Sequence, residues 1–291
     1  MKLRDCLREC EKLDWYGSKD HMNLARGQVL SCYFKQDVDK ITTQHLDKLV
    51  LWLKATGPSG RGCANSTINR YLSALSVMLK RGQRLGWLDH LPLFPEARTL
   101  REPEGRSLIV TESMLAALLL ALQQAGHYQE AQLVRFLLSM GCRVAEALSL
   151  PWQRVTLAER SLTLANTKAS KARQLPIPAE AMAVLAVLAE SGQDGLVFPL
   201  KYKTLWERHH AAVLTACNVL ALPPYVEKQW CLHSLRHTCL SKLASEGWSA
   251  PQLQQWAGHS SLAVTQRYVH QSAQDLFNLV HRGSRGIPAA D

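Results

Sequence analysis

Long hydrophobic runs are missing from this sequence of 291 residues. The longest apolar stretch extends from Leu115 to Leu122, whereas a membrane-spanning helix needs about 20 mostly apolar residues. The N-terminus also lacks the charged and apolar pattern of a signal peptide. Hydrophobic and charged contents of 47% and 20% are those of a globular protein that buries a core. We therefore expect a cytoplasmic protein with no membrane partner.

Metal-binding spacings are missing as well. The eight cysteines include no Cys-x-x-Cys pair, and the chain has no His-Glu-x-x-His motif. These are spacings at which side chains often bind zinc. Cys231, His233, His237 and Cys239 are close in sequence, but no second paired cluster accompanies them. The sequence thus predicts no metal site, and reduced thiols are expected.

Acidic residues are too few to balance the basic ones. The chain has 34 Lys and Arg residues against 24 Asp and Glu residues, a net charge of +10. The excess is shared, because residues 1–106 carry 18 basic against 12 acidic side chains and residues 107–291 carry 16 against 12. A basic protein need not bind nucleic acid, but a charge excess in both parts favours a long polyanionic partner.

The N-terminal third predicts a small helical domain at residues 21–91. Residues 1–20 are polar with scattered apolar positions, so we expect them to form an N-terminal extension. Apolar residues at helical spacing predict a helix over residues 21–36. A second helix should begin after Thr42 and end before the glycine-rich loop at residues 57–60.

The next helix should begin with Ser66 as its cap and bury a stripe that contains Ile68 and Leu72. Its opposite face is polar and basic. Such a face is often merely solvated, yet a row of cations is also what a helix needs to contact DNA phosphates. The candidate DNA-binding residues on this helix are Arg70, Lys80, Arg81 and Arg84.

Residues 92–108 have the proline-rich, charged composition of a linker. Beyond it, Thr111 should cap a helix, and a second helix should extend from Tyr128 to Ser139. Alternating apolar residues between Arg154 and Pro178 predict strands, and helical spacing returns after them. The sequence therefore predicts a mainly α protein with a small antiparallel β-sheet, in the α+β class.

Polar residues of the C-terminal part stand in an order that suggests one site. Arg143 belongs to a Gly-x-Arg-x-x-Glu run at the start of a predicted helix. His233 and Arg236 are three residues apart, so they share one face of a helix. His259 follows a glycine, and Tyr268 lies nine residues later in a polar setting. Each residue considered alone is more often structural, and their joint occurrence is what suggests a site.

These motifs carry a family resemblance. HSLRHT at residues 233–238, AGHSS at 257–261 and TQRYVH at 265–270, together with the Arg143 motif, resemble the signature of the tyrosine recombinases, which include phage integrases and Xer-type enzymes. The resemblance implies a SAM-like helical core-binding domain, followed by a catalytic domain. On this chain the catalytic domain would occupy residues 109–291, with a tail from residue 271.

The resemblance implies a role for each catalytic candidate. Tyr268 would be the nucleophile, Arg143 and Arg236 would bind the scissile phosphate, His233 would act as a general acid or base, and His259 would donate a hydrogen bond to the phosphate. The family's hairpin lysine corresponds to Lys168, which would protonate the departing 5′-oxygen. Lys171 in the same turn remains the alternative, and Lys171 and Arg173 are further candidates for DNA binding.

The residue types suit this chemistry. A phenol has a pKa of about 10, so it needs nearby cations and a base to attack a phosphodiester at neutral pH. A phosphotyrosine ester stores the broken bond, and two guanidinium forks stabilise the charge that builds on the phosphate oxygens. The resemblance therefore implies cleavage and rejoining of DNA strands with neither metal nor ATP as cofactor.

The implied partner is double-stranded DNA that contains recombination core sites, with accessory DNA-bending proteins as a further class of partner. A monomer in solution would form a homotetramer in synapsis. The tail would then dock on a neighbouring subunit through Leu276, Phe277 and Val280.

Alternatives remain open within and beyond the family. A type IB topoisomerase shares the chemistry but acts as a monomer, and a DNA-binding regulator could have lost catalysis. Among recombinases, an integrase of a mobile element is favoured over a resolvase, but the sequence does not separate the two.

Overall fold

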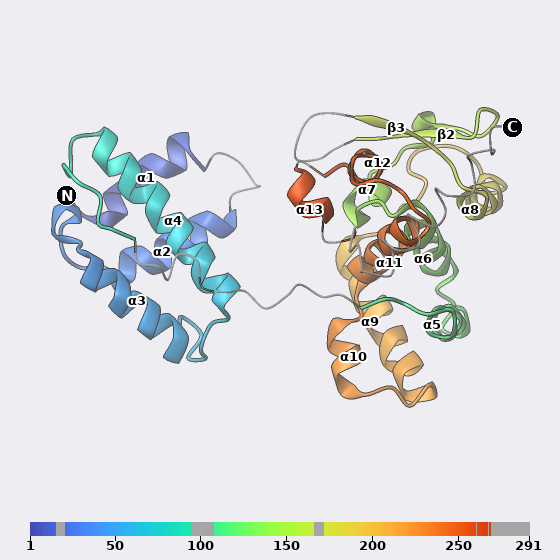
Figure 1. Ribbon diagram of the computed structural model, residues 1–291, viewed down its shortest axis with the longest axis horizontal. Coiled ribbons are helices and arrows are strands. Elements are labelled where there is room, and N and C mark those ends of the chain that lie inside the picture. The colour runs from blue at the N-terminus through green and yellow to red at the C-terminus, as the bar shows by residue number, and fades with distance from the viewer. Residues whose placement is uncertain are drawn as a thin grey trace, which may run out of the picture. The chain divides into compact units, whose positions relative to one another are not determined.

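The computed structural model describes residues 1–15, 21–94, 100, 108–165, 172–259, 261–266 and 268. The chain divides into two compact units, Met1–Gly105 and Arg106–Asp291 (Figure 1). Most described residues are helical, and one three-stranded antiparallel sheet lies in the second unit. The predicted α+β class with a small sheet is therefore confirmed.

The first unit is helical. It consists of α1 (Leu3–Leu13), α2 (His21–Tyr33), a short 3-10 helix (Val38–Lys40), α3 (Thr43–Ala55) and α4 (Asn65–Arg84). The spacing of apolar residues positions these helices well, since Leu46, Leu49 and Leu53 of α3 and Leu72 of α4 are all fully buried. The predicted start of α3 after Thr42 is confirmed.

Two expectations for this unit are wrong. Residues 1–20 were expected to be an extension outside the helical domain, but α1 buries Leu3, Cys6 and Cys10 against α2 and α4. Three apolar positions on one face are enough to make a short helix part of the core. Ser66 does not cap α4 either, because the helix begins one residue earlier and its first hydrogen bonds go to the carbonyl of Ala64.

The second unit begins with α5 (Glu112–Gln124) and α6 (Tyr128–Met140). Thr111 caps α5 as predicted, since its hydroxyl accepts a hydrogen bond from the backbone N–H of Met114 at 3.3 Å. The remaining helices are α7 (Val144–Leu148), α8 (Ala179–Ala189), α9 (Tyr202–Val219), α10 (Pro224–Gln229), α11 (Leu232–Ser245), α12 (Ala250–Ala257) and α13 (Leu262–Gln266), with a 3-10 turn at Trp152–Arg154.

The sheet has the order β1 (Val155–Thr156), β2 (Ser161–Leu164), β3 (Arg173–Pro176), and both pairings are antiparallel. Leu162 pairs with Leu175, and both are buried because residues paired across neighbouring strands point to the same face of the sheet. Leu164 pairs with Arg173 at the end of the hairpin, which fixes where β3 begins.

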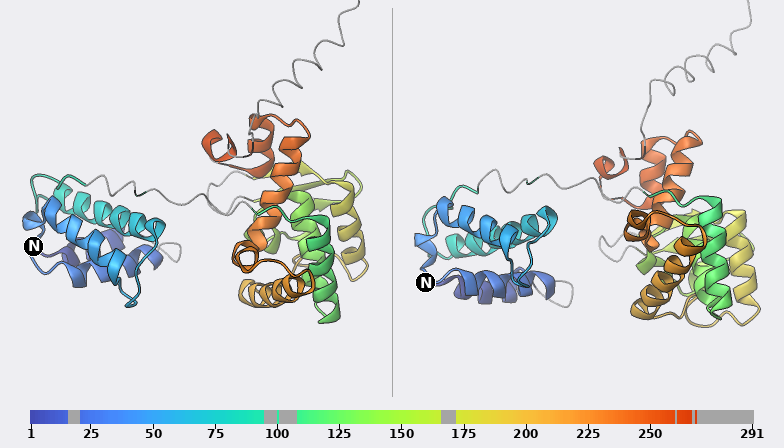
Figure 2. Two further views of the ribbon diagram at one scale, coloured as in Figure 1. Left: turned by 60° about the horizontal axis from the view of Figure 1, so that its bottom comes forward. Right: turned by 90° about the horizontal axis from the view of Figure 1, so that it is seen from below.

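The core of the second unit lies between these helices and the sheet, and α6 contacts both α8 and α11. Phe136 of α6 contacts Phe198 at a ring-centroid distance of 5.1 Å, and both rings are buried. The helices α11 to α13, coloured orange to red, lie together on one side of this unit in both views of Figure 2. No helix in the described part of the chain is both long and apolar enough to cross a bilayer.

Candidate active site

A tight turn after α6 positions Arg143. Gly141 ends α6 in the left-handed conformation (φ 58°), which favours glycine because a side chain there is strained. Arg143 then precedes the first turn of α7, and the carboxylate of Glu146 accepts its backbone N–H at 2.8 Å. This cap by the Glu146 side chain explains the spacing of the Gly-x-Arg-x-x-Glu run.

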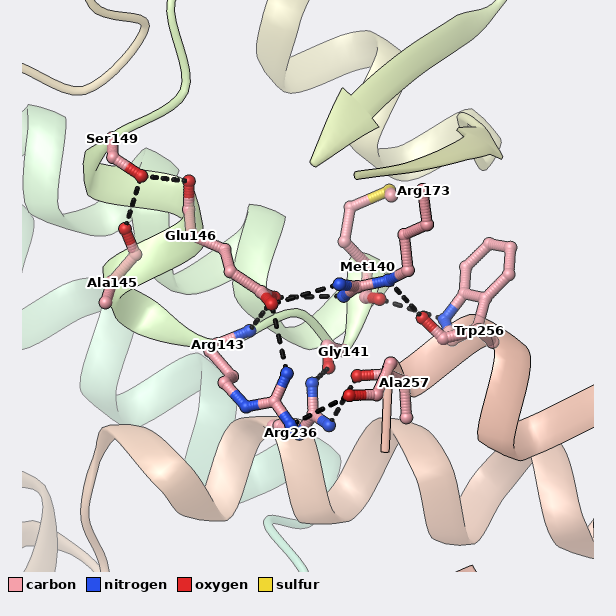
Figure 3. A network of polar contacts seen from close by, with 11 residues as sticks. Met140, Gly141, Arg143, Ala145, Glu146, Ser149, Arg173, Arg236, Trp256 and Ala257 are labelled. Atoms are coloured by element: carbon pink, nitrogen blue, oxygen red, sulfur yellow. Dashed lines mark hydrogen bonds and ion pairs between the residues drawn. The ribbon is translucent and has the colours of Figure 1, made fainter. Parts of the chain in front are cut away.

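Arg236 on α11 is almost completely buried, with 2% of its surface exposed. Its two terminal nitrogens donate to the carbonyl oxygens of Gly141 and Ala257, both at 2.7 Å (Figure 3). Burial and repulsion from Arg143 lower the pKa of Arg236 from 12.5 to about 10, against opposing effects of Glu146 and Tyr268. The guanidinium therefore stays charged at neutral pH although little water solvates it.

The C-terminal end of α12 holds three arginines. Its last carbonyls each accept a hydrogen bond from a different guanidinium: Trp256 from Arg173 at 3.0 Å, Ala257 from Arg236 at 2.7 Å and Gly258 from Arg143 at 3.0 Å. A helix C-terminus carries partial negative charge and unpaired carbonyls, so it is a natural site for cations. These carbonyls hold the guanidinium groups in place without neutralising them.

Tyr268 lies shortly after the end of α12 in the sequence. The Nδ1 atom of His259 lies 2.9 Å from the hydroxyl of Thr265. The ring of His259 is nearly parallel to that of Tyr268, with centroids 6.2 Å apart and an angle of 10°. His237 of α11 meets the same tyrosine ring edge-on at 5.0 Å. One imidazole from α11 and one from the turn after α12 thus contact the phenol ring and fix its orientation.

The cluster has more positive than negative charge. Among its described members, three guanidinium groups (Arg143, Arg173 and Arg236) face one carboxylate (Glu146), which leaves a net charge of +2. Burial by itself would raise the pKa of Glu146, but hydrogen bonds from Arg173 and the Arg143 backbone outweigh it and hold that pKa below its usual value. The carboxylate is therefore ionised, and the remaining charge favours an anionic ligand.

Metal ligands are not grouped in this way. In the ranges that the structure describes, no three or more His, Cys, Asp or Glu side chains lie where they could hold a metal ion.

A profile of the phage integrase family matches residues 109–275, which is more than half of the chain and includes the whole arginine and histidine cluster. The chain belongs to the phage integrase family. A tyrosine recombinase of Thermosipho africanus (strain TCF52B) is 21% identical over 254 residues, which cover 86% of this chain and 87% of the relative. The chain is accordingly a tyrosine-type site-specific recombinase.

Solved structures share the fold of this recombinase. The Tn1549 transposon integrase in complex with a circular intermediate DNA superposes with a TM-score of 0.78 at 16% identity, over 97% of this chain and 99% of the other. A lambda integrase tetramer bound to a Holliday junction gives a TM-score of 0.71 at 14% identity, over 92% and 77%.

The recombinase brings four of its predicted catalytic residues into one cluster, namely Arg143, Arg236, His259 and Tyr268. His233 lies on α11 one turn before Arg236 and is exposed. The candidates Lys168 and Lys171, and the tail residues Leu276, Phe277 and Val280, lie outside the described residues.

Arg173 is not placed as predicted. The sequence suggested a DNA contact, but only 12% of its side chain is exposed, and its terminal nitrogens donate to both oxygens of Glu146 at 3.0 and 2.9 Å. Its Nε donates to the carbonyl of Trp256. These contacts argue against the predicted DNA contact, because the Glu146 carboxylate already balances the charge of Arg173.

The candidate DNA-binding residues of α4 are mostly on the surface. Arg70, Lys80 and Arg84 are exposed. Arg81 instead donates to both carboxylate oxygens of Asp14 at 2.8 and 2.6 Å, so its charge is balanced within the first unit. Lys80, Arg81 and Arg84 nevertheless line one pocket together with Asp14 and Val77.

Two contributors to the active site were missed. Glu146 was read only as part of a motif, although a glutamate three residues after the residue that precedes a helix is the signal of a side-chain cap. Thr265, which contacts His259, had no signal beyond its proximity in sequence to the motifs.

Proposed function

We propose that this recombinase cleaves DNA by attack of the Tyr268 phenol oxygen on the scissile phosphorus. The bond from Tyr268 to phosphorus forms as the bond to the 5′-oxygen breaks, which yields a 3′-phosphotyrosine ester and a free 5′-hydroxyl. Joining is the same exchange in reverse, with a 5′-hydroxyl as the nucleophile. One observation carries the proposal: the stacked His259–Tyr268 pair directly follows the helix end that holds Arg143 and Arg236.

The two arginines stabilise the transition state in this mechanism. Charge accumulates on the non-bridging phosphate oxygens, and guanidinium groups already fixed by carbonyls need little reorganisation to meet it. Arg143 is suited to contact the phosphate because 36% of its side chain is exposed. Arg236 stabilises the phosphate charge from a buried position, where low solvation strengthens its electrostatic field.

Proton transfer is divided between the remaining candidates. His233 accepts the phenol proton as Tyr268 attacks, and His259 donates a hydrogen bond to the phosphate. Lys168 gives a proton to the departing 5′-oxygen, with Lys171 as the alternative donor. These assignments rest on the family pattern of the sequence.

The DNA substrate is a duplex with recombination core sites, which the first unit contacts through Arg70, Lys80 and Arg84. We propose a monomer that assembles into a homotetramer on two duplexes, with its tail docking on the neighbouring subunit. The lambda integrase tetramer bound to a Holliday junction supports this assembly by its shared fold. Within the cell we place the reaction in the cytoplasm, and integration of a mobile element is the favoured role.

A nicked suicide duplex tests the chemistry. After cleavage the short 5′-hydroxyl strand diffuses away, so the covalent adduct accumulates and peptide mapping identifies the attached residue. We expect an adduct at Tyr268 that forms equally well in EDTA, because the guanidinium groups supply the positive charge. Tyr268→Phe should bind the duplex with unchanged affinity and form no adduct.

Tyr225→Phe is the matched control, since that tyrosine is 61% exposed on α10 and should leave the adduct yield unchanged. An adduct on another residue, or one that survives Tyr268→Phe, contradicts the proposal. Relaxation of supercoiled DNA without any strand exchange between duplexes would instead identify a topoisomerase-like enzyme.

A further inference from the structure

We propose that Arg173 is a positioning residue for the cleavage reaction, which holds Glu146 and thereby fixes Arg143 beneath the scissile phosphate. This inference rests on the proposed function above and deepens it. Arg173 belongs to β3, which pairs with β2 in the sheet. Its role therefore connects the sheet to the arginine cluster.

The carboxylate of Glu146 shows why Arg173 is needed. Its Oε1 accepts a terminal nitrogen of Arg143 at 3.0 Å and one of Arg173 at 3.0 Å. Its Oε2 accepts the backbone N–H of Arg143 at 2.8 Å and the other terminal nitrogen of Arg173 at 2.9 Å. A carboxylate has about four lone-pair sites, so these four hydrogen bonds satisfy it. Arg173 provides half of them.

Arg173 also ties the carboxylate to the end of α12 (Figure 3). Its Nε donates to the carbonyl of Trp256, two residues before the carbonyl of Gly258 that holds Arg143. The guanidinium lies so close under Gly258 that a Cβ built there would be 2.6 Å from its Nη1. The sheet, α7 and the histidine-bearing turn after α12 therefore meet at one side chain.

Loss of Arg173 would change the state of Glu146. The carboxylate side chain has no exposed surface, so with half of its hydrogen bonds removed burial would dominate and raise its pKa. A protonated Glu146 would no longer hold Arg143 by charge. An ionised one would still hold Arg143 by charge, but without Arg173 the carboxylate itself would be less firmly fixed. Both states slow cleavage without removing a DNA contact, and the protonated state slows it more.

Arg173→Met tests this role, because methionine fills much of the same volume without charge or hydrogen bonds. Single-turnover cleavage of the nicked duplex at saturating protein should be about 10- to 100-fold slower, by analogy with the loss of residues that orient metal ligands by hydrogen bonds. The dissociation constant for the duplex should stay within about twofold and keep its salt dependence. Arg154→Met, the same change at an exposed arginine of the same unit, should alter neither quantity.

The pH profile separates positioning from a general loss of structure. The ratio of the Arg173→Met rate to the wild-type rate should rise with pH, because Glu146 becomes ionised only above its raised pKa. In Glu146→Gln/Arg173→Met this added pH dependence should vanish. Arg173→Lys keeps a charge beside Glu146, so it should be slower than wild type but show no added dependence. It also serves as the test variant if Arg173→Met is unfolded by circular dichroism.

A pH-independent rate ratio for Arg173→Met would overturn the proposal. So would a loss of DNA affinity as large as the loss of rate together with a weaker salt dependence, which would indicate direct phosphate contact. The wild-type reaction distinguishes the two levels of inference: if Tyr268 forms no adduct in the unmodified protein, the proposed function itself fails.

Discussion

Cations of the two units occupy opposite environments. On α4, Arg70, Lys80 and Arg84 extend into water. In the second unit, Arg236 is 2% exposed, and carbonyls at the ends of α6 and α12 hold it. Exposed charges attract a polyanion over a distance and are screened by salt, whereas buried charges act at one position and are screened little. The first unit should therefore govern affinity, and the second should govern rate.

The largest effect that this contrast predicts is for Arg236→Lys. A lysine cannot donate to both carbonyls and also present a planar fork, so single-turnover cleavage should fall by about 10²- to 10³-fold, as for the loss of a transition-state donor. Affinity for the duplex should barely change.

In the same variant the cleavage rate should also depend on pH differently from the wild-type rate. Burial and Arg143 already lower the pKa of Arg236 to about 10, and a lysine starts from a lower reference value. The ratio of the Arg236→Lys rate to the wild-type rate should therefore fall as pH rises above neutrality, because the ammonium loses its proton first. A ratio that is flat up to about pH 9 would show that the site does not desolvate the cation as the structure indicates.

His209 gives a contrast with Arg236, because it is also buried but one of its ring nitrogens has no hydrogen-bond partner in the described structure. That nitrogen is Nε2, and burial, aided by His210, lowers the pKa of His209 from 6.5 to about 4. The unfolded chain then binds a proton that the folded chain does not, so stability is full above pH 6.5 and is lost as pH falls towards 4. At about pH 5 the expected loss is about 2 kcal/mol.

His209→Leu should remove this acid sensitivity. We expect the free energy of unfolding in urea to fall less between about pH 7.5 and about pH 5 than in the wild-type chain, by about 2 kcal/mol. His127→Leu, the same change at a partly exposed histidine of the same unit, is the matched control. Equal pH dependence in wild type and His209→Leu would show that His209 is solvated or paired.

In the first unit, Lys80→Ala/Arg84→Ala should weaken binding and leave the cleavage rate at saturation intact. We expect about tenfold lower affinity at low salt and a slope of log K against log salt that is smaller by about 2. Lys54→Ala on α3 removes an exposed cation that lies outside the α4 pocket and should change the slope little. A reduced cleavage rate at saturation would break the proposed separation between the units.

Asp14→Asn should have the smallest effect on affinity for DNA, and it should raise that affinity rather than lower it. Asp14 balances Arg81, and the hydrogen bond from Arg81 holds the pKa of that carboxyl below its usual value. Removal of the negative charge leaves Arg81 free to attract phosphates, so affinity at low salt should rise by about two- to threefold. The same increase in Asp14→Asn/Arg81→Met would show that Arg81 is not the cause.

Much of the fold could be predicted, because local rules determine it. The stripe of Leu46, Leu49 and Leu53 on α3 and the Thr111 cap of α5 depend only on nearby residues. Residues 3–13 were underestimated because their burial depends on α2 and α4, which follow in the chain. The six-residue α10 was missed because one and a half turns give little periodicity to detect.

The active site shows the same limit. Arg143, Arg236, His259 and Tyr268 were found because a family pattern records their order. Arg173 was misassigned because nothing near it in sequence reveals the carbonyl of Trp256, which lies 83 residues away. Sequence reveals which groups the chemistry needs, but the partners that immobilise those groups come from distant segments.

The left-handed turn at Gly258 has a consequence for the tolerance of this recombinase to change. Its φ of 64° aims a carbonyl at Arg143, and its missing side chain leaves room for a guanidinium underneath. Even alanine at this position would therefore strain the backbone and also displace the guanidinium of Arg173. A single methyl group at a position that supplies no reactive side chain would thus slow the enzyme while leaving every one of its catalytic residues unaltered.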